Sequence, residues 1–162
     1  MPYFFRIHTD INLVYKKVWG IYDDAASREA HALWDEMTAS DPAIEAYDEL
    51  QDLTGVTDYR VSIALIHQLA DRYASRWQGD AHRPKRMAYV VPSPEAYGTG
   101  RVYGTLMEAT AIEFRACHDF AEAAEWLGLD ASEIERVIEA GTDETGTQTT
   151  RSGSSDGSSD AG

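Results

Sequence analysis

The sequence lacks residues that several common protein classes need. Cys117 is the one cysteine among 162 residues, which excludes an internal disulfide and a cysteine-based zinc site. No apolar run approaches the ~18 residues of a membrane span, and no charged start followed by an apolar stretch marks a secretory signal. These absences predict a cytoplasmic protein with no integral membrane segment.

Basic residues are also scarce. The chain has 14 Lys and Arg against 28 Asp and Glu, a formal net charge of −14, and its lysines are Lys16, Lys17 and Lys85. A chain this acidic is repelled by phosphate backbones and by anionic membrane surfaces. We therefore expect no nucleic-acid partner.

The C-terminal stretch contains almost nothing that a core could bury. Residues 142–162 are Thr, Ser, Gly, Asp, Glu and Gln with one Arg and one Ala. Such a segment cannot offset its own ordering entropy. Since the length fits one domain, we predict a folded domain over residues 1–141 and a disordered tail over 142–162.

Hydrophobic periodicity predicts a hairpin followed by alternating helices and strands. The expected strands are 3–8, 13–21, 47–53, 87–91 and 112–118, and the expected helices are 24–40, 61–77, 94–109, 120–127 and 132–140. Strict alternation after a hairpin is typical of an α/β fold. We expect a mixed, mostly parallel sheet of about five strands with covering helices.

Three segments carry a family resemblance: 47–58 (YDELQDLTGVTD), 87–101 (MAYVVPSPEAYGTGR) and 114–128 (FRACHDFAEAAEWLG). Together they resemble the SpoIIAA-like, STAS-like family of small prokaryotic proteins over about residues 3–128. The last segment departs from the family pattern, because Ala-Cys-His separates Arg115 from Asp119. The resemblance implies a STAS-like fold, also compared with CRAL-TRIO lipid-transfer domains, and no known activity.

In related anti-anti-sigma factors, a D-S-S-G turn carries a phosphorylated serine. The matching stretch here, residues 52–62, lacks that motif but offers the hydroxyls of Thr54, Thr57 and Ser62. A phosphate at the following helix N-terminus would be stabilised by free amides. The alternative, which we favour, is that these residues shape the turn and cap the helix.

A glycine-rich helix offers the candidate ligand-binding residues Tyr97, Gly98, Gly100 and Arg101. Arg101 suits bidentate recognition of a carboxylate or phosphate. The alternative, which we favour slightly, is a salt bridge to a carboxylate on the neighbouring strand or loop. The spacing of Gly98, Gly100 and Gly104 resembles a dinucleotide fingerprint. Its first glycine lies too far from the preceding strand, so we interpret these glycines as close helix–sheet contacts.

Catalytic signals are weak. Asp52 and Asp58 flank Thr57, and their burial without a basic partner would favour an enzyme. Cys117 and His118 are adjacent on an expected strand, so their side chains point to opposite faces. No histidine pair has the spacing of a helical metal site. We predict no catalytic residues, no metal and no cofactor.

Two further features are candidate contact surfaces. The opening hairpin is rich in aromatic residues, and any face left exposed would be an interface: Tyr3, Phe4, Phe5, Tyr15, Trp19 and Tyr22. Residues 82–86 (HRPKR) form a basic run, interpreted as a solvated loop or a docking site for an acidic partner.

The sequence therefore favours a non-enzymatic, regulatory STAS-like module that binds another protein or a second copy of itself. The alternative is a domain that binds a small apolar or anionic ligand in a pocket under the glycine-rich helix, with Arg101 as anion anchor. That alternative predicts an apolar cavity beside the helix.

Overall fold

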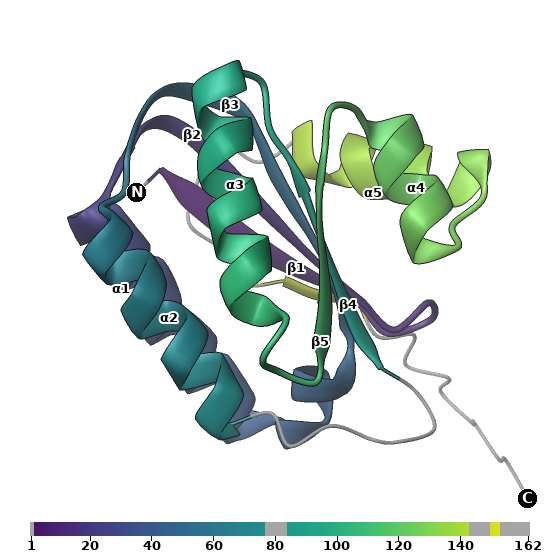
Figure 1. Ribbon diagram of the computed structural model, residues 1–162. Coiled ribbons are helices and arrows are strands. Elements are labelled where there is room, and N and C mark those ends of the chain that lie inside the picture. Colours follow the sequence, from purple (N-terminus) through teal and green to yellow (C-terminus); the bar gives the residue numbers. More distant parts are fainter. Residues whose placement is uncertain (1, 77–83, 143–149, 153–162) are drawn as a thin grey trace, which may run out of the picture.

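The computed structural model describes residues 2–76, 84–142 and 150–152 (Figure 1). The elements follow the expected order with two additions, a 3-10 helix η1 and a sixth strand. They are β1 (Tyr3–His8), β2 (Leu13–Asp23), α1 (Asp24–Ser40), η1 (Pro42–Ala46), β3 (Asp48–Arg60), α2 (Ile63–Arg76), β4 (Lys85–Val90), α3 (Pro94–Met107), β5 (Ile112–Cys117), α4 (Phe120–Leu127), α5 (Ala131–Thr142) and β6 (Thr150–Ser152).

The strands form one mixed sheet in the order β5-β4-β3-β2-β1-β6. The hairpin strands β1 and β2 are antiparallel, and every other neighbouring pair is parallel. Helices α1, α2 and α3 cover one face, and α4 and α5 cover the other (Figure 1). The predicted fold class, a mixed and mostly parallel sheet with covering helices and an opening hairpin, is confirmed.

The predicted turn over residues 52–62 is mostly strand. β3 continues to Arg60 because β2 pairs with it along its whole length, from Leu13↔Asp48 to Asp23↔Arg60. Register shifts between Lys17 and Trp19 and between Gly20 and Ile21 take up the two extra residues of β3. The polar Asp-Leu-Thr-Gly stretch has turn chemistry, yet a neighbouring strand satisfies its main chain. Thr54 and Thr57 therefore lie within β3, and the prediction that they shape a turn was wrong.

Local sequence signals explain where the helices begin and end. Side-chain oxygens of Asp23, Ser93 and Asp119 accept hydrogen bonds from the main-chain N–H groups that open α1, α3 and α4. Pro94 fills the first turn of α3. Gly128 ends α4 in the left-handed conformation, with φ 71°, as expected for a helix C-terminus.

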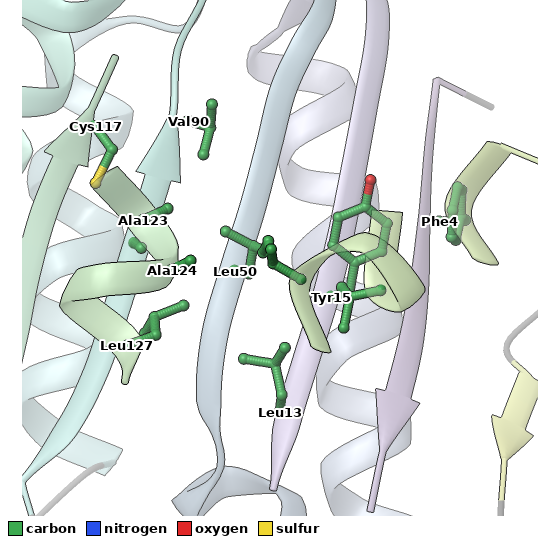
Figure 2. Packing of buried hydrophobic residues seen from close by; sticks show 12 residues of the cluster. Phe4, Leu13, Tyr15, Leu50, Val90, Cys117, Ala123, Ala124 and Leu127 are labelled. Carbon is green, nitrogen blue, oxygen red and sulfur yellow. The ribbon is translucent and has the colours of Figure 1, made fainter. Parts of the chain in front are cut away.

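Both faces of the hairpin are buried in core. Phe4 and Tyr15 pack with α4 and α5 in the cluster shown in Figure 2, whereas Tyr3, Phe5 and Tyr22 pack with α1 on the other side. All of these side chains are at most 5% exposed, and Trp19 is partly buried against the first cluster. The aromatic load of the hairpin is core, so it forms no exposed aromatic interface.

Part of the predicted tail belongs to the fold. Thr142 ends α5, and residues 150–152 form β6, which pairs in parallel with Arg6–His8 of β1. The sequence did not predict this strand, because main-chain pairing at a strand edge needs no apolar side chains. The division into a domain over residues 1–141 and a disordered tail over 142–162 stays a prediction. The rest of the predicted tail, residues 143–149 and 153–162, lies outside the described residues.

The described end of the basic run lies in a strand. Lys85 and Arg86 begin β4, and Lys85 is 1% exposed. His82 and Arg83 lie outside the described residues. Since Lys85 is buried, the interpretation of this run as a basic docking loop was wrong at that residue.

Candidate functional site

An open groove of about 850 Å³ runs along the outer side of β5. One wall is α3, which contributes Tyr97, Arg101, Thr105 and Glu108, and the other is α4, which contributes Glu122 and Trp126. β5 itself forms the floor. A smaller hollow of about 350 Å³ shares Arg115, Glu122 and Trp126 with the groove and extends it past α4.

The floor of the groove is an open sheet edge, because β5 pairs only with β4 among the described strands. Val91 N donates a hydrogen bond to Cys117 O, and the main chains of alternate residues in a parallel strand point to the same side. Arg115 and Glu113 therefore point their main chains at β4 as well. The N–H and C=O groups of Phe114 and its alternate neighbours face the groove.

Arg101 is exposed on the α3 wall. Within the part of the chain that the structure describes, its guanidinium makes no hydrogen bond or ion pair. The salt bridge that the sequence left open as an alternative is not formed. Arg101 is thus a free cationic donor on the wall of a groove, and Tyr97 lies one turn before it on the same wall.

The α4 wall carries a chain of aromatic and charged contacts. Tyr97 stacks on His118 with ring centroids 4.2 Å apart. Glu122 accepts a hydrogen bond from His118 N at 2.9 Å and pairs with Arg115 at 3.4 Å. The His118 main-chain N–H is the main reason that the pKa of Glu122 lies below its usual range. Sequence reasoning had set His118 aside as structural.

Two guanidinium groups lie over the Trp126 ring. The Cζ atoms of Arg115 and Arg86 are 5.4 and 5.6 Å from its centroid, within the range of a cation–π contact. Arg86 also pairs with Glu113 on β5 at 3.5 Å. The floor of the groove therefore presents charges of both signs side by side.

The glycines of α3 serve different purposes. A Cβ at Gly104 would lie 2.8 Å from Cδ1 of Phe114, and one at Gly100 would lie 3.3 Å from the Cβ of Ala116, whereas nothing lies within 4 Å of Gly98. Close helix–sheet packing is confirmed for Gly100 and Gly104. Gly98 lines neither the groove nor the cavity under α3.

The space under α3 is filled by side chains. The cavity there, lined by Gly100 and Tyr103 among others, has a volume of about 20 Å³, roughly the room of one water. The predicted apolar pocket under the glycine-rich helix is therefore absent from the described core. Arg101 faces the outer groove instead of that space.

The hydroxyl and carboxylate groups of 52–62 satisfy one another. Asp52, 2% exposed, accepts hydrogen bonds from Tyr15 OH at 2.6 Å and from Thr54 N and Oγ1 at 2.9 and 2.6 Å. Asp58 pairs with Arg60 at the surface. Asp52 is buried without a basic partner, which is the condition that would favour an enzyme. Three donors nevertheless hold its carboxylate within the sheet, and Asp52 lines none of the hollows described here.

Ser62 links two helices. Its Oγ accepts from Leu65 N at the start of α2, at 3.2 Å, and donates to Asp24 of α1 at 2.7 Å. The favoured interpretation, a capping residue, fits this geometry. Phosphorylation of Ser62, Thr54 or Thr57 remains a prediction.

Sequence reasoning missed a group of buried charges between the sheet and α1. Lys85 and Glu49 form an ion pair with Nζ 2.7 Å from Oε1, not aligned as a hydrogen bond. Lys16 donates to Tyr22 OH at 3.2 Å. Burial is the main cause that lowers the pKa of His31 to about 3. Glu49 and Lys85 occupy strand positions of ordinary alternation, so no sequence signal distinguished them.

Other chemistry is sparse among the described residues. Cys117 is fully buried, and burial raises the pKa of its thiol to about 12. Residues 2–76, 84–142 and 150–152 hold no cluster of three or more His, Cys, Asp or Glu side chains arranged for a metal ion. Among those same residues, no helix combines the length and apolarity that crossing a bilayer requires.

Topology thus defines an α/β protein with a mixed sheet and a groove at one edge. No protein-family model matches the chain, and a search of curated proteins found no match. Among solved structures, the chain is similar to an uncharacterized protein from the DUF3478 family with a SpoIIAA-like fold from Shewanella loihica PV-4. The two are 16% identical, with 71% of this chain and 83% of the other covered and a TM-score of 0.45.

Proposed function

We propose that this protein is a non-enzymatic STAS-like module that acts by contact with another protein molecule, and that the groove along β5 is its contact surface. The observation that carries this proposal is an 850 Å³ groove whose floor is a strand edge with which no other described strand pairs. Such an edge is a ready template for another extended chain, because its N–H and C=O groups seek partners.

The shape of the groove supports a macromolecular partner over an enclosed apolar ligand. The groove is open along residues 112–116 of β5, whereas the inner cavity has room for about one water. A small-molecule site normally buries most of its ligand. The acidic composition, with a net charge of −14, argues against nucleic acid as that partner.

The non-enzymatic part of the proposal is supported by the state of the candidate groups. The Cys117 thiol is buried and its pKa is raised, which disfavours the nucleophilic thiolate. Asp52 is held by three donors inside the sheet. A regulatory role and a cytoplasmic location remain predictions from the sequence.

A second candidate function is supported by Arg101. Its free guanidinium on the groove wall suits bidentate binding of a carboxylate or phosphate. A small anionic ligand held there would use Tyr97 beside it as an apolar surface. In this alternative Arg101 anchors the anion in the outer groove and not in a pocket under α3.

Site-specific photo-crosslinking in the native host tests the first proposal. A photoreactive side chain replaces Thr105 on the groove wall or, as matched control, Glu36 on the exposed side of α1. Protein adducts from position 105 and none from position 36 are expected. Equal yields at both positions, or none at position 105, would contradict the proposed surface.

Native mass spectrometry tests the alternative. A small molecule that is present in the native protein, lost on denaturation and absent from Arg101→Ala would support the anionic-ligand function. An unchanged apo mass in both proteins would reject it.

A further inference from the structure

The exposed edge of β5 carries opposite charges on either side of Phe114. Glu113 precedes Phe114, Arg115 follows it, and both are exposed on the α4 face of the sheet. In an antiparallel pair of β5 strands with Phe114 opposite Phe114, each Glu113 would face Arg115 of the other strand. Opposite charges at directly facing positions stabilise a strand pair, and like charges destabilise it.

The N–H and C=O groups of β5 point in the directions that this pairing needs. Cys117 O accepts from Val91 N of the β4 side, so the main chains of Cys117 and its alternate neighbours face β4. The N–H and C=O of Phe114 therefore face the groove. Two such residues facing each other exchange both hydrogen bonds. Glu113 and Arg115 then fall at the non-hydrogen-bonded positions, where facing side chains lie closest.

Opposite charges also lie on either side of Phe114 on the α3 wall of the groove. Gly104 packs directly on the Phe114 ring, so the middle of α3 lies above the middle of β5. Arg101 and Glu108 stand on either side of it and both line the groove. Among the described residues neither side chain has a partner. A second α3 running antiparallel across the same axis would bring Arg101 opposite Glu108.

We propose that a second copy of this chain occupies the groove, with β5 paired antiparallel to β5 across a two-fold axis at Phe114 and α3 facing α3. This rests on the proposed function of the groove as a protein-contact surface and names its partner. A two-fold interface is self-complementary, so each copy places a charge of opposite sign opposite each of these positions on the other. The two sheets become one continuous sheet.

Charge complementarity selects this occupant over a strongly acidic peptide. The groove offers Arg101 and Arg115, but it also holds Glu108, Glu113 and Glu122. An acidic segment would meet repulsion from three carboxylates. A second copy of the same groove matches both signs.

Sedimentation velocity of the full chain over a concentration series tests the proposal. The wild type is expected to be a dimer. Glu113→Arg and Arg115→Glu each place like charges at two symmetric positions, so each raises the dimer dissociation constant by about tenfold or more. The double variant E113R/R115E restores opposite charges and recovers dimerisation. Arg101→Glu, Glu108→Arg and their double variant give a second, independent charge swap.

Arg28→Glu, at an exposed position on α1, is the control for a general effect of charge and leaves the dimer intact. Circular dichroism confirms that each variant is folded. A monomeric wild type overturns the proposal, as does a dimer in which neither double variant recovers what its single variants lose. Crosslinking from position 105 separates the two proposals: an adduct to a different protein with a monomeric wild type retains the contact surface and rejects the self-pairing.

Discussion

Gly104 of α3 lies so close to Phe114 of β5 that a Cβ atom at position 104 would stand 2.8 Å from Cδ1 of the ring. Phe114 cannot move aside easily, because its ring packs edge-on against Tyr89 and Tyr103 with centroids 4.7 and 5.0 Å away. This contact sets how closely α3 approaches the edge strand.

Gly104→Ala is therefore expected to destabilise the protein despite the better helix propensity of alanine. Overpacking costs about 1–3 kcal/mol, and the propensity gain offsets about 1 kcal/mol. Gly98→Ala is the matched control, because nothing lies within 4 Å of that position, and it should stabilise by up to about 1 kcal/mol. Urea denaturation of both variants measures the difference; a stable Gly104→Ala would contradict the close contact.

Removal of one partner from the buried Lys85–Glu49 pair should be costly. Lys85 and Glu49 side chains are 1% and 6% exposed, so Lys85→Met leaves a carboxylate buried without its cation, at about 3–5 kcal/mol. The exposed pair Arg60–Asp58 provides the comparison, and Arg60→Met should cost far less, because solvent screens an exposed ion pair. Chemical denaturation measures the free energy of unfolding of both variants. Equal losses of stability would contradict a cost that depends on burial of the Lys85–Glu49 pair.

His31 makes stability depend on pH. Its pKa falls from 6.5 in the unfolded chain to about 3 in the fold, so below pH 6.5 the unfolded state binds a proton that the folded state does not. Stability then decreases on acidification, by about 1.4 kcal/mol per pH unit between these two values. His31→Asn should flatten this dependence between pH 7 and pH 5, and an unchanged slope in that variant would contradict the role of His31. Thermal unfolding of the wild type and of this variant across that range measures the difference.

Cys117 should be unreactive while the protein is folded. The side chain is 0% exposed and burial raises the pKa of its thiol to about 12, so both access and thiolate formation are disfavoured. A chromogenic disulfide reagent should label it at the rate of unfolding, and immediately in denaturant. Rapid labelling of the native protein would reopen thiol chemistry as a function.

The sequence was most informative where apolar periodicity was strong. The helix that begins at Asp24 and the helix that ends at Gly128 were predicted at their observed bounds, because capping residues and apolar spacing agree there. The stretch from Asp52 to Arg60 was misread, since its polar composition matches a turn and its strand conformation depends on the distant β2.

The site was only partly predictable. Arg101 and Tyr97 were singled out, and both line the groove. That β5 is an edge strand follows from the strand order, which no local pattern encodes. The strand formed by residues 150–152 was missed for a related reason, because it joins β1 through its main chain.

The two ends of the sheet differ, since β6 lies against Arg6–His8 of β1 while β5 has no strand beyond it among those described. The edge strand at the β6 end is three residues long, and very short edge strands disfavour further pairing, so β5 is the edge better suited to self-pairing. In a dimer joined at β5, the outer edge of each sheet would be the short strand β6, so the assembly would stop at two molecules. If both ends were open, the same chemistry would allow unlimited addition and fibres.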